Sequence, residues 1–488
     1  MRIGAGSRHA VLLDEGLDDA TLLVIGGKGR AVASMVSLGL PVPPAFCVTS
    51  GWCDEEPAKL VDRLWQDVLG GLEVLEERTG RVFGSGPRPL LLSVRSSGVT
   101  SMPGMLETVL NVGVDDGVVD ALGREHSRPF AEDVRERFRR GYRRAVGAPA
   151  PDRPLDQLRG ALDAVVSSWS SSRAEAYRAH RGLDRGGISI LLQAMVFGNL
   201  DDRSGTGVLF TRNPTTGAST PFGEWLSAAQ GEDVVSGITD CEPLASMREL
   251  LPEAHDQLVD AGTRLERLAG DVQDVEFTVE AGTLWLLQAR VAQRSPQAAL
   301  RLALAFRDEG LVDDAEVIER VTPEQLETLL AVRSAPAGRL LATGAAACPG
   351  VASGVACTTS DDAIAAADEG RDVILVRPTT SPDDVAGLVA ANGVVTEVGG
   401  ASSHAAIVAR ELGIPAVVGC GVGLTAAMAG LVITVDGDAG EVRIGESASS
   451  QPVLSPELAR FAEIVRAAAP NAVGDLPALH LAARSGRP

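Results

Sequence analysis

The segment Gly-Gly-Ala-Ser-Ser-His at positions 399–404 places one histidine directly behind a glycine turn. Ile407, Val408 and Leu412 then recur at helical spacing, which predicts that His404 lies in the first turn of a helix ending before Gly413. Unpaired amides and the positive end of the helix dipole favour an anion on the imidazole, and a neutral ring before reaction. Such a histidine can attack a phosphoryl group and become phosphohistidine. A buried or helix-capping histidine is the alternative, and the local pattern does not decide between them.

A second group of chemically competent side chains lies on a predicted β-hairpin. Two segments of alternating polarity flank a Glu-Ala-Gly-Thr turn, as hairpin strands do. With Gly282 at the centre of the loop, Glu276 falls opposite Gln288 and Asp274 falls opposite Arg290, and all four side chains share one face. Two carboxylates, an amide oxygen and a guanidinium can hold Mg²⁺ and the triphosphate that it neutralises. A solvated face with ordinary salt bridges is the alternative interpretation.

Further phosphate-binding candidates lie near the N-terminus. Gly26-Gly27-Lys28-Gly29 opens a predicted helix, where close backbone approach and the Lys28 charge suit a phosphate, although the Walker P-loop spacing is missing. The run Ser93-Val94-Arg95-Ser96-Ser97 ends an apolar strand and leads into Ser101-Met102-Pro103-Gly104-Met105. An arginine at a strand end before a Gly/Ser loop suits a mobile phosphate clamp. An ordinary surface turn explains the same residues.

The elements that position these residues follow from periodicity and helix breakers. Strands and helices alternate from about residue 20 to 330, and a compact α/β unit runs from about 345 to 445. Breakers near both ends of Arg333–Gly344 indicate a linker. One amphipathic helix is predicted over Pro456–Ala469, with poor order beyond it. The expected divisions are a first domain over 1–335, a linker over 336–344, a second domain over 345–446 and a tail over 447–488.

Composition limits the class of protein. The 488 residues exceed one ordinary core, and 45% apolar with 22% charged residues is a globular balance. The net charge of −21 argues against a nucleic-acid partner. Six scattered cysteines without a CxxC pair indicate reduced thiols. Because there is neither an apolar signal core in the first ten residues nor a run of eighteen apolar residues, we expect a soluble, cytoplasmic protein without a membrane partner.

Longer motifs resemble a known family. The stretch from Val376-Arg377-Pro378-Thr379-Thr380 through His404-Ala405-Ala406 resembles the phosphohistidine domain of pyruvate phosphate dikinase and phosphoenolpyruvate synthase. Other segments resemble the ATP-grasp nucleotide-binding domain of the dikinase. They are Gly26–Phe46, Val94–Gly113, Gln193–Asn199, Ser204–Pro214, Ala229–Gly237 and the hairpin. The motifs at 101–105 and 230–237 favour the dikinase over the synthase and the rifampin phosphotransferase. Ser402 stands where many dikinases have a threonine that regulatory proteins phosphorylate.

The resemblance implies an α/β (α+β) multidomain fold, with an ATP-grasp domain followed by a swivelling phosphohistidine domain. It makes His404 the carrier, phosphorylated from ATP and inorganic phosphate with release of AMP and pyrophosphate. Glu276 and Gln288 become the Mg²⁺ ligands. The ATP and Mg²⁺ ligands that it implies are Lys28, Arg95, Asp274, Glu276, Gln288 and Arg290.

The acceptor of the phosphate is left open. The dikinase has a C-terminal barrel for pyruvate or phosphoenolpyruvate, whereas 42 residues follow Glu446 here, too few for a unit of about 250 residues. We therefore expect the nucleotide half-reaction alone, with a separate acceptor protein or a small-molecule acceptor. Alternatives are an antibiotic-type small-molecule phosphotransferase and a non-catalytic nucleotide-binding regulator. Water could replace phosphate as co-substrate, and a homodimer is one alternative for the oligomeric state.

Overall fold

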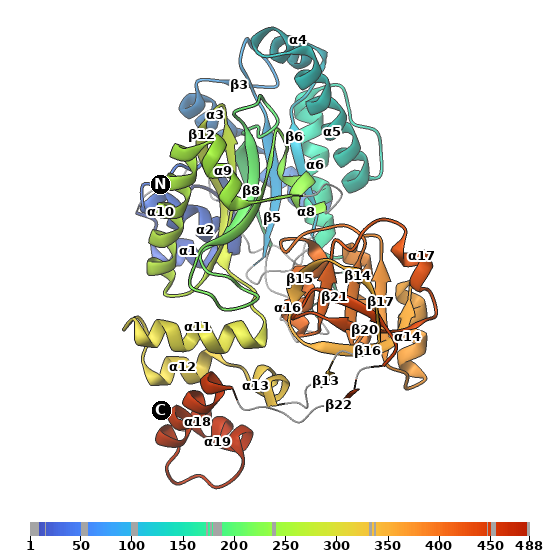
Figure 1. Ribbon diagram of the computed structural model, residues 1–488. Coiled ribbons are helices and arrows are strands. Elements are labelled where there is room, and N and C mark those ends of the chain that lie inside the picture. The colour runs from blue at the N-terminus through green and yellow to red at the C-terminus, as the bar shows by residue number, and fades with distance from the viewer. Residues whose placement is uncertain are drawn as a thin grey trace. The chain divides into compact units, whose positions relative to one another are not determined.

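The computed structural model describes residues 9–14, 16–49, 57–98, 106–171, 174–175, 178, 188–236, 241–330, 334–335, 338–446, 448–449 and 455–485 (Figure 1). Contacts divide the chain into two compact units, Met1–Gly205 with Glu276–Arg290, and Thr206–Val275 with Val291–Pro488. The division passes through two neighbouring strands, β11 (Gln273–Glu280) and β12 (Thr283–Val291). The predicted motif Ser101–Met105 and the end of the 230–237 motif at Gly237 lie outside the described residues.

The first unit contains an antiparallel sheet with the strand order β1-β2-β7-β5-β6. Its strands are β1 (Ala10–Leu12), β2 (Ala45–Val48), β5 (Leu92–Gly98), β6 (Thr108–Val112) and β7 (Ile188–Ala194). Its helices are α1 (Asp19–Val24), α2 (Gly26–Ser37), α3 (Pro57–Thr79), α4 (Asp116–Glu125), α5 (Arg128–Val146) and α6 (Pro154–Trp169). Short strands β3 (Val82–Phe83) and β4 (Pro89–Leu90) pair in parallel. Helices α3, α5 and α6 contact the sheet and share a continuous apolar core with it.

A second sheet has the order β10-β9-β8-β11-β12. Its further strands are β8 (Gly205–Phe210), β9 (Phe222–Ser227) and β10 (Glu242–Pro243). Helices α8 (Gly231–Ser236), α9 (Leu244–Leu250) and α10 (Pro252–Ala269) follow these strands in the chain. Beyond the hairpin come α11 (Pro296–Asp308), α12 (Asp314–Arg320) and α13 (Pro323–Leu330).

The third large sheet, in the second unit, has the order β14-β21-β20-β16-β17-β18-β19-β15. Its strands are β14 (Arg339–Thr343), β15 (Ala345–Cys348), β16 (Val351–Cys357), β17 (Val373–Arg377), β18 (Gly393–Thr396), β19 (Ala416–Val418), β20 (Val432–Asp436) and β21 (Glu441–Ile444). Strands β16 to β19 are parallel. The remaining elements are α14 (Ser360–Asp368), a 3₁₀ turn (Pro382–Asp384), α15 (Val385–Ala390), α16 (His404–Leu412), α17 (Leu424–Met428), and β13 (Ser334–Ala335) paired with β22 (Ala448–Ser449).

Alternation along β17 explains why this sheet is covered on both faces. Val373 and Leu375 pack into one apolar cluster, which includes residues of α16, whereas Ile374 and Val376 pack into another. Successive strand residues point to opposite faces, so a continuous apolar run requires a core on each side. Helix α16 is thus held on one face of the sheet through Ala405, Ala406 and Ala409.

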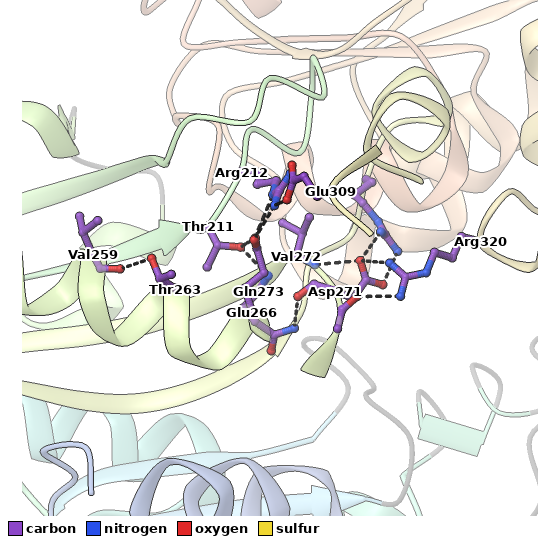
Figure 2. Close-up of polar contacts among 12 residues, drawn as sticks. Thr211, Arg212, Val259, Thr263, Glu266, Asp271, Val272, Gln273, Glu309 and Arg320 are labelled. Carbon is purple, nitrogen blue, oxygen red and sulfur yellow. Dashed lines mark hydrogen bonds and ion pairs between the residues drawn. The ribbon is translucent and has the colours of Figure 1, made fainter. Parts of the chain in front are cut away.

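A buried ion-pair network joins parts of the second unit that are far apart in sequence (Figure 2). Arg212, just after β8, donates to Glu266 of α10 at 2.8 Å and to Glu309 after α11 at 2.7 Å. Its guanidinium also lies over the Phe306 ring at 4.2 Å. Asp271 forms a neighbouring ion pair with Arg320 of α12 at 3.6 Å. These contacts hold the segment after β8 against helices α10, α11 and α12.

Several elements differ from the sequence prediction. Arg339–Thr343, assigned to a linker, forms strand β14, because its backbone pairs with β21. The tail has a second helix, α19 (Leu476–Ser485), which packs on α18 (Pro456–Ala468) as well as on α12 and α13 (Figure 1). Burial of Leu479 and Ala483 against these helices stabilises a segment too short to be helical alone. Within the described residues, no helix is both long and apolar enough to span a membrane.

Candidate functional site

Lys28 lies in the first turn of α2, where the helix start is fixed to strand β5. The Lys28 backbone N–H donates to Ser97 Oγ at 2.9 Å, and Lys28 Nζ donates to the Ser96 carbonyl oxygen at 2.6 Å. Gly26 permits this close approach, since it has φ +71° and a Cβ there would overlap the Ser97 carbonyl oxygen. The predicted helix after the glycine turn is confirmed. Arg95 differs slightly from the prediction, because it lies inside β5 rather than at its end.

The charges around Lys28 favour an anion. Burial lowers the pKa of Lys28 to about 7, and the neighbouring Arg95 and Arg290 charges lower it as well, while Glu276 raises it. The ammonium therefore lies in a partly buried place where other cations repel it. A polyanion would offset both the burial of the ammonium and the repulsion between the cations, because each of its negative charges can pair with one of these cations.

The predicted hairpin is confirmed, and it brings further polar groups to this place. Strands β11 and β12 are neighbours in the sheet, joined by Ala281 and Gly282 with φ +49° and +83°. Arg95 Nη2 lies 3.3 Å from Glu276 Oε2, and Gln288 Nε2 donates to Glu276 Oε1 at 3.3 Å. The Glu276 carboxylate is thus shared by an arginine from β5 and an amide from β12. Positive φ at consecutive turn positions is typical of tight hairpin turns.

Glu276 and Gln288 also fit a magnesium ion. Gln288 Oε1 is buried and has no hydrogen-bond partner within the described part of the chain. A buried carbonyl-type oxygen beside a carboxylate matches the hard oxygen ligands that Mg²⁺ prefers. The described residues include no group of three or more His, Cys, Asp or Glu that could hold a metal.

Asp274 and His404 belong to the second unit, whereas the other predicted site residues belong to the first. Asp274 is 4% exposed and lies two residues before Glu276, so the two side chains leave β11 on the same face. The structure therefore brings Lys28, Arg95 and the hairpin residues together in one unit. Their predicted roles as ligands stay predictions.

His404 is the first residue of helix α16, as predicted. Ser403 caps the helix by accepting from the Ala406 N–H, and Gly413 ends it in the left-handed conformation. The ring contacts Thr380 through Nδ1, which lies 3.2 Å from Thr380 Oγ1. His404 Nε2 is buried and has no hydrogen-bond partner within the described ranges. Burial lowers the pKa of His404, against the opposing charge of Asp384, so the imidazole is neutral near pH 7.

The segment that carries Thr380 is itself fixed by Asp384. Asp384 accepts from Ser360 Oγ at 2.9 Å and from the Ser381 N–H at 2.9 Å, and it pairs with Arg377 at 3.1 Å. These contacts hold the turn between β17 and α15 in place, and Thr380 with it. If Nδ1 donates its hydrogen to Thr380, the Nε2 lone pair is free to act as a nucleophile.

Glu224 was not singled out from the sequence, yet it contacts the loop before His404. Its carboxylate accepts from the Ala401 N–H at 2.8 Å and from the Ser402 N–H at 3.0 Å, and the Ser402 hydroxyl also donates to it. Glu224 is one polar residue on a strand of mixed polarity, between two of the quoted motifs. Nothing in the local sequence distinguishes it from a solvated strand residue.

Comparisons with known proteins agree with this arrangement. Residues 56–243 match the sequence model of the pyruvate phosphate dikinase AMP/ATP-binding domain, and residues 370–440 match that of the mobile domain of PEP-utilising enzymes. Pyruvate, phosphate dikinase of Rhizobium meliloti (strain 1021) is 38% identical over 94% of this chain and 60% of its own length. Pyruvate, phosphate dikinase 1 of Arabidopsis thaliana, chloroplastic, is 38% identical over 94% of this chain and 55% of its own length. A solved structure of Enzyme I (nEIt) shares 33% identity, covering 19% of this chain and 37% of that chain, with a TM-score of 0.14 that supports no comparison of folds.

This chain spans about 55–60% of the length of these relatives. The nucleotide-binding match precedes the mobile-domain match, in the order that the two groups of motifs predicted. Together with 38% identity over nearly the whole chain, these matches show that the chain belongs to the pyruvate phosphate dikinase family.

Proposed function

We propose that this chain is an ATP-dependent phosphotransferase of the dikinase type, which phosphorylates its own His404. The observation that supports this best is the place of His404 at the start of α16, with Nδ1 beside Thr380 Oγ1 and Nε2 buried without a partner within the described residues. A merely structural histidine needs no free ring nitrogen. Family membership and the relatives' names support the same activity.

The first unit would bind the nucleotide. Lys28, Arg95 and Arg290 supply cations for the triphosphate, and Lys28 becomes fully charged when an anion lies beside it. Glu276 and Gln288 would hold Mg²⁺, which, when bound, neutralises charge on the phosphate oxygens. Asp274 lies on the same strand and adds a further carboxylate to the ligand set. The protein's contribution is alignment and charge, because phosphoryl transfer needs little covalent assistance.

In the first step, the His404 Nε2 lone pair attacks the β-phosphorus of ATP. An N–P bond forms, the bond from that phosphorus to the α–β bridging oxygen breaks, and AMP leaves with the electron pair. The ring gains positive charge when the N–P bond forms. The Nδ1–H donates a hydrogen bond to Thr380, and release of the Nδ1 proton to water makes the ring neutral again. Inorganic phosphate then attacks the terminal phosphorus, and the new P–O bond makes pyrophosphate. The bond from that phosphorus to the β–γ bridging oxygen breaks, and its electron pair stays with the β-phosphoryl group on His404.

Phospho-His404 would pass its phosphoryl group to an acceptor. The relatives' names make pyruvate the acceptor to test first. A swivelling movement of the mobile domain would take the phosphohistidine from the nucleotide to that acceptor.

The test is the intact mass of the protein after incubation with Mg-ATP and phosphate. We expect a single added phosphoryl group that is acid-labile, alkali-stable and absent from His404→Ala. The matched control is His255→Ala, in which a histidine on α10 that contacts Asp256 is removed. ATP binding by His404→Ala should be close to normal, since Lys28 and the hairpin are unchanged. A label that persists in His404→Ala, or a wild-type protein that binds Mg-ATP without becoming labelled, would overturn the proposal.

A further inference from the structure

Helix α2 begins without a cap from its own sequence. Ile25 stands at its N-cap position, and a hydrocarbon side chain cannot accept a hydrogen bond from the first turn. Helices α1, α4 and α5 of the same unit do have local caps, in which Asp18, Asp115 and Ser127 accept from amides of their own first turns. The first amides of a helix have no partner within it. The start of α2 therefore depends on an acceptor from another part of the chain.

Ser97 of β5 supplies this acceptor. Ser97 Oγ accepts from the Lys28 N–H at 2.9 Å and, at a longer distance of 3.4 Å, from the Gly29 N–H. It donates to the Ile25 carbonyl oxygen at 3.3 Å. A hydroxyl has one donor and two acceptor positions, so these contacts use all of them. Ser97 is 2% exposed, and it thus caps α2 across 69 residues in a place that is shielded from water.

A second serine holds Ser97 in place. Ser189 of β7 lies opposite Ser97 in the sheet, and its hydroxyl donates to the Ser97 carbonyl oxygen at 2.8 Å. Cross-strand partners share a face of the sheet, so both serines face α2. Gly26 fits directly against them, because a Cβ there would overlap the Ser97 carbonyl oxygen and the Ser189 hydroxyl. The first turn of α2 is therefore fixed on two neighbouring strands.

The Lys28 side chain is held by the residue before Ser97. Its Nζ donates to the Ser96 carbonyl oxygen at 2.6 Å, so the backbone and the side chain of the lysine contact consecutive residues of β5. An ammonium has three donor hydrogens, and one contact leaves the others for phosphate oxygens. Arg95, the preceding residue of the strand, lies close enough for its charge to act on Lys28. The cap thus fixes the lysine beside a second cation.

We propose that Ser97 is a positioning residue for Lys28, which fixes the first turn of α2 on β5 and so holds the ammonium where a triphosphate can contact it. Since Ser97 occupies the amides of Lys28 and Gly29, the group that this turn presents to a phosphate is the lysine side chain. Ser97 acts through Lys28, because its own hydrogen-bonding positions are all in use. This inference rests on the proposed function, since the position of Lys28 matters only if the first unit binds ATP.

The test is a double-mutant cycle between Ser97 and Lys28, in which calorimetry measures the affinity for Mg-ATP. Ser97→Ala leaves the first turn without its acceptor, so that the turn must be ordered when the nucleotide binds. We expect Mg-ATP to bind about 5- to 30-fold more weakly, which corresponds to the typical and the largest loss for one helix cap. In the Lys28→Met background, Ser97→Ala should change the affinity by less than about twofold, because the lysine through which it acts is absent.

Ser127→Ala is the matched control, since it removes the serine cap of α5 in the same unit. It should lower the midpoint of urea unfolding as Ser97→Ala does, and it should leave the Mg-ATP affinity unchanged. A measurement that needs no variant is hydrogen exchange of the wild-type protein without nucleotide, resolved to single residues. The Lys28 amide should exchange slowly, whereas first-turn amides without a cap exchange quickly.

The outcomes separate this inference from the proposed function. Wild-type Mg-ATP affinity in Ser97→Ala would overturn the positioning role and leave the nucleotide site standing. An equal loss with Lys28 and with Lys28→Met would also overturn it, since Ser97 would then act on the fold rather than on the lysine. Rapid exchange of the Lys28 amide in the wild-type protein would exclude the cap itself. If the wild-type protein binds no Mg-ATP, the proposed function fails and the positioning role fails with it.

Discussion

Lys28 should make ATP binding depend on pH in a defined direction. In the nucleotide-free protein, burial and the Arg95 charge lower the pKa of Lys28 from 10.5 to about 7, a cost on the order of 5 kcal/mol for the ammonium. The triphosphate restores a charge partner and raises the pKa again. Binding therefore takes up a proton above pH 7, so that affinity is greatest at or below pH 7 and falls as the pH rises.

The magnitude follows from the fraction of protonated lysine. About half of the Lys28 side chains are charged at pH 7 and about 1% at pH 9, so affinity should fall roughly 50-fold between these values if the charged form binds. The second pKa of a phosphate lies near about 6, so the nucleotide adds little to this change. The lysine also affects stability without nucleotide. Because the unfolded chain binds a proton between about pH 7 and 10.5 that the native state does not, the free energy of unfolding should rise with pH across that window.

The assay is titration calorimetry of Mg-ATP between pH 7 and pH 9, in two buffers of different ionisation enthalpy to count the protons taken up. Lys28→Arg is the informative control, because a guanidinium stays charged throughout this range and should give a nearly flat pH profile. Lys28→Met should bind more weakly and also without pH dependence. The variants are compared by the slope of ATP affinity against pH rather than by the affinity itself, because the planar guanidinium of arginine differs in shape from the ammonium of lysine.

A flat wild-type profile with no proton uptake would refute this reasoning. It would mean either that Lys28 is charged in the free protein, so that the Ser96 carbonyl and Glu276 outweigh burial, or that the triphosphate does not contact it. A slope that persists in Lys28→Arg would assign the titration to another group.

Three further predictions concern the β11–β12 hairpin, His404 and the fold. Glu276→Ala and Gln288→Ala should each weaken Mg-ATP binding by a few kcal/mol at most, which is about the value of hydrogen bonds to charged groups. If the affinity measured by calorimetry at low Mg²⁺ is unchanged, the role of the hairpin is structural. Thr380→Val should slow phosphohistidine formation in quenched-flow mass measurements without changing ATP affinity, since it removes the Nδ1 partner, and a wild-type rate would exclude this role. Arg212→Ala should lower the free energy of unfolding in urea by about 3–5 kcal/mol because the buried Glu266 carboxylate loses its partner. Arg128→Ala, which breaks exposed ion pairs, should not, and equal midpoints would contradict a structural role for the network.

The sequence predicted the elements whose signals are local. The helix at His404 follows from a capping serine, apolar residues at helical spacing and a terminating glycine, all within ten residues. The hairpin follows in the same way from alternation around a short turn with glycine. Strand β14 and helix α19 were missed, because a pairing partner about 100 residues away and a packing surface on other helices stabilise them.

The properties of the candidate site depended on contacts between distant segments. Lys28 donates to a carbonyl oxygen 68 residues away, and its partial burial there, with the nearby arginine charges, lowers its pKa. Thr380 contacts His404 across 24 residues and so gives Nδ1 of the ring a partner. The contact between Glu224 and Ala401 spans 177 residues and has no signal in either segment alone.

The sequence by itself thus determined which residue types were present at which element ends: a histidine at a helix start, a lysine after a glycine turn, and a glutamate and a glutamine on a hairpin. Caps, turns and periodicity act over a few residues along the chain, and so they can be recognised without the fold. Only the tertiary structure decided the surroundings that lower the pKa of Lys28, the ring nitrogen of His404 that has a partner, and the contact of Glu224 with the loop before His404. These depend on burial and on partners through space, because desolvation and hydrogen bonding are set by what packs around a group rather than by its neighbours in sequence.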